Sequence, residues 1–182
     1  KSEKVTVLQK NSKPLNVIVE EKSTPYKITH QHTSSVSGVT HIYLRQLVNG
    51  IEVMGTDSSI HIDASGNLIA SHNKFIENIQ NSVSQSSPRL SQEAAILSGA
   101  SKMGYNLSEL VLLDKKGGVN QEMTFNKAGI STTEIPVKLM YYHQNDIGTI
   151  LVWELSIQEG NTSDWWVFRV NASNGAIVSQ EN

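Results

Sequence analysis

Cysteine is absent from the 182-residue sequence, which excludes disulfide bonds, thiolate zinc sites, iron–sulfur clusters and cysteine nucleophiles. The absence does not fix the compartment, because a chain of 20.0 kDa can bury a core without disulfide bonds. No run of apolar residues approaches the roughly 20 that span a bilayer. The sequence starts at Lys1 without a basic–apolar signal peptide, which is compatible with a leader removed ahead of it.

Charge is also scarce, at 18% of residues, with 15 basic and 17 acidic side chains and a net charge of −2. Non-specific binding to nucleic acid or to an anionic membrane usually needs a basic surface, so both are disfavoured. The place of charged residues is taken by Ser, Thr, Asn and Gln, and 38% of residues are hydrophobic. The composition therefore predicts a folded chain, long enough for one large or two small domains.

The first half of the sequence is dominated by strand patterns. Residues 39–48 alternate between an apolar face and a face carrying His41, Tyr43 and Arg45. Asn49-Gly50 follows, which is the strongest short signal for a hairpin with a type I′ turn. A second hairpin is expected around the turn at 63–66.

The second half opens with a helix and continues with strands. Ser91 is the expected N-cap, and Gly104 the expected stop. The apolar stripe of the helix is expected to contain Ile96, Leu97, Ala100 and Met103. Three alternating strands follow, within residues 137–141, 153–157 and 166–170, and a turn at 171–175 returns the chain.

The polar stretch 78–88, NIQNSVSQSSP, separates the two halves. We interpret it as a linker between a domain at 1–77, of which 1–24 is unassigned, and a domain at 89–182. The alternative is a long surface loop within one domain. The predicted fold class is α+β, with two small domains that are each a mainly antiparallel sheet packed with a helix.

One internal similarity links the halves. Residues 60–69 align with 168–177 through a shared Asx-Ala-Ser and a nearby glycine, Gly66 in the first copy and Gly175 in the second. Each domain is thus expected to close with a similar hairpin, unless good turn chemistry recurs by chance.

The six histidines are candidate metal ligands. A zinc-binding helix spaces two histidines four residues apart, and no pair here has that spacing. His30 and His32 share a face of an expected strand, and with His41 on a neighbouring strand they could bind a metal weakly. We interpret them instead as solvent-facing strand residues, and His61 as an exposed position between two buried isoleucines.

Motifs for catalysis are missing. The sequence has no Gly-x-Ser-x-Gly, and Gly117-Gly118 lacks the Lys-Ser/Thr that completes a phosphate-binding loop. Trp165 and Trp166 are more informative, because adjacent strand residues point to opposite faces. If Trp166 is in the core, Trp165 is exposed, and beside Trp153 or Tyr142 it would form an apolar patch suited to a partner. The alternative is that the helix of this domain covers the second face.

The first half resembles a known family. The sequence GVTHIYLRQ at 38–46 followed by VNGIEV at 48–53 resembles the fungalysin/thermolysin propeptide domain, whose pattern is a Thr-His-aromatic-x-x-Gln strand, an Asn-Gly turn and an apolar return strand. Residues 59–75 continue the resemblance with a strand, an Asp/Gly turn and a strand.

The second half resembles a PepSY domain, in the PRLS opening at 88–91 with its helix and in the strands at 134–141, 151–155 and 165–170. The resemblance covers about residues 25–182. In this order, the two halves look like the pro-region of a secreted bacterial fungalysin-family zinc metalloprotease.

The resemblance implies an intramolecular chaperone and inhibitor of a catalytic domain expected to follow Asn182. It implies no catalytic residue, metal site or cofactor in this chain, with zinc in the catalytic domain. The implied partner is that domain, with neither nucleic acid nor membrane, and the implied location is secreted or extracellular, with passage through the periplasm. The candidate contact residues are His41, Tyr43, Arg45, Gln46, Trp165 and Asn182. The structural turns are assigned to Asn49, Gly50, Gly66 and Gly175.

Two other functions stay open. The first is a free-standing secreted PepSY-type protease inhibitor or protein-binding module. The second is a small-molecule or metal-binding enzyme built on His30, His32 and His41. The sequence beyond Asn182 separates the leading function from the first alternative, because a pro-region continues into a His-Glu-x-x-His helix and a free-standing module ends.

Overall fold

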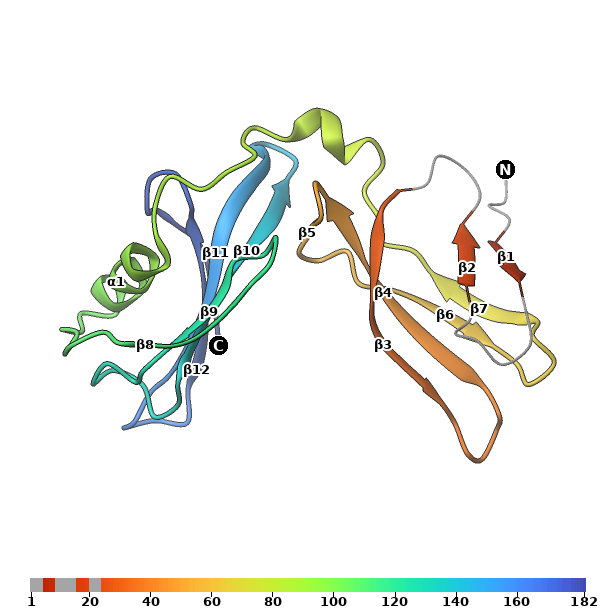
Figure 1. Ribbon diagram of the computed structural model, residues 1–182, viewed down its shortest axis with the longest axis horizontal. Helices are drawn as coiled ribbons and strands as arrows, with labels where there is room; N and C mark the ends of the chain where they lie inside the picture. Colours follow the sequence, from red (N-terminus) through yellow and green to blue (C-terminus); the bar gives the residue numbers. More distant parts are fainter. Residues whose placement is uncertain (1–4, 9–15, 20–23) are drawn as a thin grey trace. The chain divides into compact units, whose positions relative to one another are not determined.

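The computed structural model describes residues 5–8, 16–19 and 24–182, and the chain divides into two compact units (Figure 1). The first unit contains Lys1–Val48 and Val53–Glu77, and the second contains Asn49–Glu52 and Asn78–Asn182. The sheets are antiparallel, which confirms the predicted α+β class. Within the described residues the one α-helix belongs to the second unit, and the first unit consists of strands and turns.

The first unit is built on a sheet with the strand order β3-β4-β6-β7. Two further strands, β1 and β2, pair antiparallel with each other. The bounds are β1 (Val5–Leu8), β2 (Asn16–Val19), β3 (Tyr26–Thr33), β4 (Thr40–Val48), β5 (Ile51–Glu52), β6 (Ser58–Ile62) and β7 (Leu68–His72).

Strand β4 alternates as its sequence predicts. Ile42 and Leu44 are buried and form a core cluster with Ile60 and Ile62 of β6. The residues between them are only half-buried, because side chains of period two face opposite sides of the sheet. Strand β4 therefore carries the core on one face and polar side chains on the other.

The turn after β4 has the backbone conformation of a type I′ hairpin. Asn49 has a φ of 51° and Gly50 a φ of 80°. Positive φ at both central positions is what this turn needs, and Asn-Gly adopts it at little cost.

The two similar hairpins share one turn. Asp63 and Asn171 each accept, through Oδ1, a hydrogen bond of 2.8 Å from the N–H two residues further on. Gly66 then has a φ of 87° and Gly175 a φ of 78°. The repeated sequence therefore corresponds to a repeated Asx turn, with one more residue in the second copy before the glycine.

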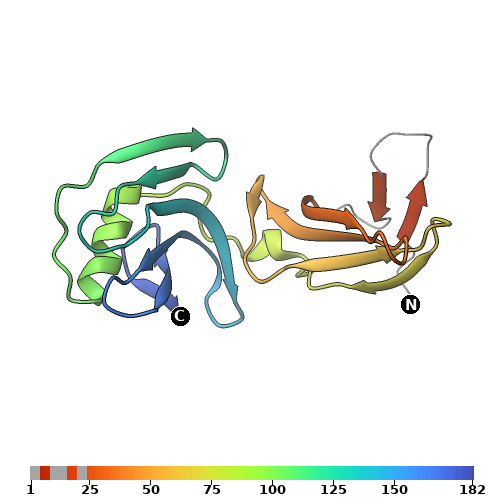
Figure 2. The same cartoon turned by 90° about the horizontal axis from the view of Figure 1, so that it is seen from below.

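The second unit is a six-stranded sheet in the order β13-β12-β11-β10-β9-β8, and α1 lies against one of its faces (Figures 1 and 2). Each strand pairs antiparallel with its neighbour in sequence. The bounds are α1 (Gln92–Lys102), β8 (Leu112–Gly117), β9 (Glu122–Phe125), β10 (Ile135–Gln144), β11 (Gly148–Gln158), β12 (Trp165–Asn171) and β13 (Ile177–Glu181).

The helix begins where its sequence predicts. The side chain of Ser91 accepts a hydrogen bond from the N–H of Ala94, and Glu93 lies in the first turn. A Cβ at Gly99 would lie 3.5 Å from both Leu155 and Phe168, so the helix packs closely on the sheet.

The expectation that Leu97 belongs to the apolar stripe of α1 is wrong. Leu97 is 54% exposed, and Ala95 and Gly99 are buried with Ile96 and Ala100 instead. The buried positions 92, 95, 96, 99 and 100 recur at helical spacing, and Leu97 lies outside the face that they form.

The polar stretch at 78–88 is part of the second unit. It contains a short 3₁₀ helix, η1 (Ile79–Ser82), and then runs beside the start of β11. The Oγ of Ser82 lies 2.6 Å from the Oγ1 of Thr149, and the N–H of Ser84 donates to the carbonyl of Thr149 at 3.0 Å. The hydroxyl of Tyr141 donates to the carbonyl of Gln85 at 3.0 Å. The stretch predicted as a linker is therefore hydrogen-bonded to strands of the second unit. The predicted domain boundaries stay a prediction.

Candidate functional site

Three candidate contact residues share the outer face of β4. His41, Tyr43 and Arg45 alternate with the buried residues and are half-buried. Arg45 donates from Nε at 2.9 Å and from Nη2 at 2.7 Å to Oδ1 of Asp57. The guanidinium charge is therefore partly compensated within the first unit.

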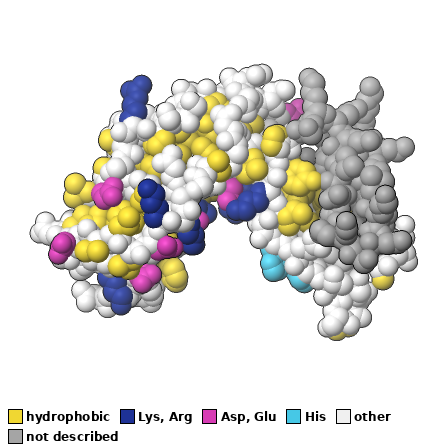
Figure 3. Space-filling model, in the orientation of Figure 1, with side chains coloured by type: hydrophobic (Ala, Val, Ile, Leu, Met, Phe, Trp, Pro, Cys, Tyr) yellow, Lys and Arg dark blue, Asp and Glu magenta, His cyan; other side chains and the backbone are white. Residues whose placement is uncertain are grey.

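Histidine rings surround His41 on this face. Its Nδ1 lies 2.7 Å from the Nδ1 of His61, which is directly opposite on β6. The ring of His32 stacks on His41 with the centroids 4.8 Å apart, and His30 lies 5.2 Å from His32. Histidine side chains are visible on the surface of the molecule in cyan (Figure 3). The trio expected from the sequence is thus brought together, and His61 joins it.

Gln46 does not lie on this face. Its side chain is fully buried, and its amide bonds both backbone groups of Ile76: Nε2 donates to the carbonyl and Oε1 accepts from the N–H, each at 2.9 Å. The reason is the period of the strand, because Gln46 occupies the same face as Ile42 and Leu44. We therefore leave Gln46 out of the proposed contact surface.

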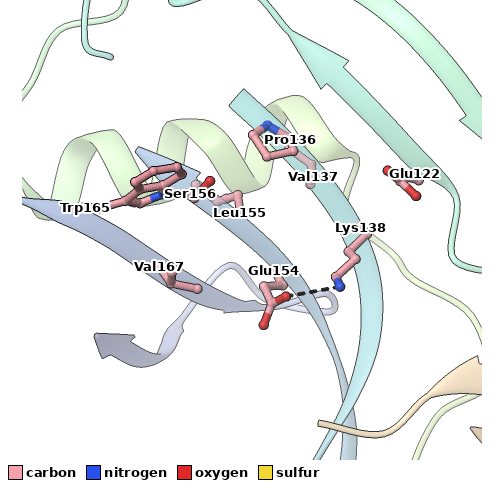
Figure 4. Close-up of a pocket in the computed structure, with 9 residues that line it drawn as sticks. All are labelled: Glu122, Pro136, Val137, Lys138, Glu154, Leu155, Ser156, Trp165 and Val167. Atoms are coloured by element: carbon pink, nitrogen blue, oxygen red, sulfur yellow. Dashed lines mark ion pairs between the residues drawn. The ribbon is translucent and has the colours of Figure 1, made fainter. Parts of the chain in front are cut away.

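The second candidate surface is the face of the large sheet opposite α1. A groove on it is lined by residues of four adjacent strands, β9, β10, β11 and β12 (Figure 4). Trp165 and Val167 of β12, Ser156 of β11 and Pro136 of β10 provide its less polar part. Trp165 is 52% exposed, so a large apolar side chain is accessible at the groove.

The other aromatic residues are not beside Trp165. Trp153 is buried on the opposite face, where its Nε1 donates to the carbonyl of Leu90 at 2.9 Å. Tyr142 pairs with Ile150 on β11, whereas Trp165 pairs with Gln158, eight residues further along the same strand. The expected aromatic patch is therefore wrong, and the neighbours of Trp165 are aliphatic and charged.

A row of alternating charges crosses the sheet beside the groove. Lys138 lies 3.4 Å from Glu154, and Glu154 lies 3.1 Å from Arg169. Arg169 also lies 2.6 Å from Glu181. Because each charge has an opposite partner on the next strand, the row stabilises the sheet and presents little net charge.

The last residue of the chain is tied to the start of β12. The N–H of Trp165 donates to Oδ1 of Asn182 at 3.1 Å, and Nδ2 of Asn182 donates to Oδ1 of Asp164 at 2.9 Å. Two of the candidate contact residues, Trp165 and Asn182, are thus adjacent although 17 positions separate them. The sequence signal for this contact was weak, because it depends on the register of β12 with β13.

Perturbed pKa values occur at three other places. Hydrogen bonds from the backbone and side chain of Asn67 lower the pKa of Asp63, the hydrogen bond to Glu159 raises the pKa of Tyr105, and the hydrogen bond to Glu122 raises the pKa of Lys116. Among the described residues, no group of three His, Asp or Glu is placed to hold a metal ion. The described helices include none that is long and apolar enough to cross a membrane.

Comparison with known proteins identifies a motif in the first unit. Residues 24–75 match the family described as the Fungalysin/Thermolysin Propeptide Motif, which confirms the resemblance expected for this half of the chain. The matched range contains β3, β4, β5, β6 and β7.

Proteins named bacillolysin or extracellular metalloproteinase are similar over most of the chain. Bacillolysin from Brevibacillus brevis is 22% identical over 158 residues, which is 86% of this chain and 27% of that protein. Extracellular metalloproteinase 3 from Arthroderma gypseum is 26% identical over 165 residues, and its namesake from Arthroderma otae is 24% identical over 163. Both alignments cover 86% of this chain and 25% of the relative. The chain thus spans about a quarter of the length of these curated relatives.

Among solved structures, the Bacillus megaterium YpeB C-terminal domain is similar with a TM-score of 0.42 and 11% identity. The similarity covers 86% of this chain and 55% of that one.

Proposed function

We propose that this chain is the pro-region of a secreted zinc metalloprotease, and that it acts as folding chaperone and inhibitor of a catalytic domain that follows Asn182. The observation that carries the proposal is the propeptide motif at 24–75, together with the metalloproteinases that align over 86% of the chain. In this role no residue of the chain is catalytic, and zinc belongs to the catalytic domain. The second half serves as a PepSY-type domain.

The proposed partner is a protein outside the cell. Two of the relatives are named extracellular metalloproteinases, which supports secretion with passage through the periplasm. The net charge of −2 favours a protein partner over nucleic acid or an anionic membrane.

The groove beside Trp165 is the proposed main contact. A half-exposed tryptophan next to aliphatic side chains is the kind of anchor that dominates binding energy at interfaces. Asn182 is held against the same strand, so a domain that follows it is tethered beside the groove at an effective concentration of about millimolar. Tethering lets a modest contact inhibit efficiently within one precursor.

The outer face of β4 is the proposed second contact, through His41, Tyr43 and Arg45. Tyrosine and arginine are enriched at binding hot spots. The pairing of Arg45 with Asp57 also holds the guanidinium in place, so a partner would meet an already ordered side chain.

The first test is the coding sequence beyond Asn182, followed by expression of the catalytic domain with and without this chain. The proposal expects a frame that continues into His-Glu-x-x-His, and active protease only when the chain is supplied during folding. A stop codon directly after Asn182 would overturn the pro-region and leave the free-standing inhibitor.

The second test is inhibition of the mature protease by the purified chain. Trp165→Ala and Arg45→Ala should each weaken inhibition by about 1–2 kcal/mol. Leu97→Ala removes a similarly exposed apolar side chain from α1 and serves as the control. Asp57→Ala removes the carboxylate that orders Arg45 and should weaken inhibition less than Arg45→Ala does. Folded Trp165→Ala that inhibits as well as the parent chain would exclude the groove as the contact.

A further inference from the structure

A pair of histidines on the first unit has metal-binding chemistry that the proposed function does not use. His41 on β4 and His61 on β6 are directly opposite each other in the antiparallel register. Their Nδ1 atoms face each other at 2.7 Å, and both side chains are part-buried. Directly opposite positions bring Cβ atoms within about 5 Å, so the two strands hold the rings together without a loop.

Hydrogen bonding orients one ring of the pair. The Nε2 of His61 lies 3.2 Å from the Oγ of Ser59, two residues before it on β6. When Nε2 carries the proton and donates it to this hydroxyl, Nδ1 of His61 is left with its lone pair. A second partner that fixes the tautomer is the usual support of a metal-ligating histidine.

The ring of His32 restrains His41, the other member of the pair. His32 stacks on His41 with an interplanar angle of 16° and a centroid distance of 4.8 Å. In the metal-free pair, Nδ1 of His41 can donate its proton to Nδ1 of His61. To ligate a metal, His41 needs its proton on Nε2, which is a change of tautomer without a change of charge.

The two nitrogens are close enough to share one ion. With metal–nitrogen bonds of about 2.0–2.1 Å, two ligands of one ion lie about 2.9–3.3 Å apart. The observed 2.7 Å is the length of the hydrogen bond in the metal-free pair, so a small rotation of the rings brings both nitrogens to that spacing. Imidazole nitrogens are suitable ligands for Cu²⁺ and Ni²⁺.

We propose that His41 and His61 bind one divalent transition-metal ion, Cu²⁺ or Ni²⁺, through their Nδ1 atoms, with water at the remaining positions. The site is a pair because the described residues offer no group of three ligands placed for a metal. A bound ion would cross-link β4 to β6 in the middle of the sheet. The inference is independent of the proposed function, since it needs neither a protease nor a groove.

Titration of the whole chain with Ni²⁺, followed by calorimetry near pH 7.5, tests the site. The expected result is saturable binding that His41→Gln and His61→Gln each weaken at least tenfold. His72→Gln is the matched control, because His72 is an exposed histidine on β7 of the same sheet, and it should bind as the parent chain does. Lack of saturable binding at millimolar Ni²⁺, or equal binding by all variants, would overturn the proposal.

A second measurement covers the case in which a variant fails to fold. Paramagnetic Ni²⁺ broadens the NMR signals of nearby residues, so the unaltered chain should lose its His41 and His61 amide signals first. Broadening centred on the amino terminus or on His143 instead would show that the ion binds elsewhere, and would overturn the site.

Discussion

Gln46 and Ile76 are joined by two hydrogen bonds that together close a ring. Nε2 of Gln46 donates to the carbonyl of Ile76, and the backbone N–H of Ile76 donates to Oε1 of Gln46, each at 2.9 Å. The backbone N–H of Gln46 also donates to Oγ1 of Thr56 at 3.1 Å. A fully buried amide thus ties the end of the first unit to the middle of its sheet, 30 residues away.

We expect Gln46→Met to lower the free energy of unfolding by about 1–3 kcal/mol. Methionine is similar in size, so the main loss is the pair of partners for the backbone of Ile76, which become unsatisfied polar groups. Urea unfolding measures the effect, with Gln31→Met on the exposed strand β3 as control. A variant as stable as the parent chain would show that water replaces the amide.

We expect Gly50→Val to destabilise by about 1–2 kcal/mol and Gly50→Ala by less. Space is not limiting, because a Cβ there would lie 3.6 Å from Val119, an ordinary contact. The cost comes from the φ of 80°, which a β-branched residue tolerates poorly. Thermal unfolding compares these variants with Gly160→Val, a glycine without positive φ. Equal midpoints for the two valine variants would exclude backbone strain as the cause.

The turn at Asp63 should make the free energy of unfolding depend on pH in the acidic range. Hydrogen bonds, first of all from the backbone N–H of Asn67, lower the pKa of Asp63 below its ordinary value of 3.8. The ionised turn therefore contributes stability above that value and loses it as the pH falls through the lowered pKa. Asp63→Asn should be less stable than the parent near neutral pH, and the difference in stability should narrow as the pH falls below 3.8 and through the lowered pKa. Unfolding at several pH values checks this, with Asn67→Ala expected to be intermediate; a constant difference would contradict it.

Thr149→Val should open the stretch at 78–88 to proteases. The buried hydroxyl of Thr149 lies 2.6 Å from the Oγ of Ser82 and 2.8 Å from the Nδ1 of His143. Valine keeps the shape and removes both hydrogen bonds, at a cost of about 1–2 kcal/mol. Limited proteolysis with mass spectrometry should find faster cleavage within 78–88, while the exposed Thr133→Val cleaves as the parent does. An unchanged cleavage rate would show that the backbone contacts alone keep this stretch ordered.

Local patterns predicted much of the fold. The alternation of β4, the N-cap at Ser91 and the position of Trp165 on an open face all depend on residues close in sequence, and all are confirmed. The stretch at 78–88 differs, because its hydrogen bonds go to Thr149 and its polar composition does not reveal them.

Contacts across strands were harder to predict. The neighbours of His41 and Trp165 depend on register, and the sequence showed neither that His61 lies opposite His41 nor that Tyr142 lies far from Trp165. Gln46 was the exception, since its place on the apolar face of β4 was visible in the alternation. Its burial could have been inferred from the same pattern that buried Ile42 and Leu44.

The sheet of the second unit is a pure meander, in which every strand pairs with its predecessor in the chain. Such a sheet closes over short loops, and the entropy lost at each step is small. It can therefore assemble hairpin by hairpin during synthesis, without waiting for a distant strand. In the chaperone role proposed above, this sheet would have to be finished before the catalytic domain folds, and its topology permits that order.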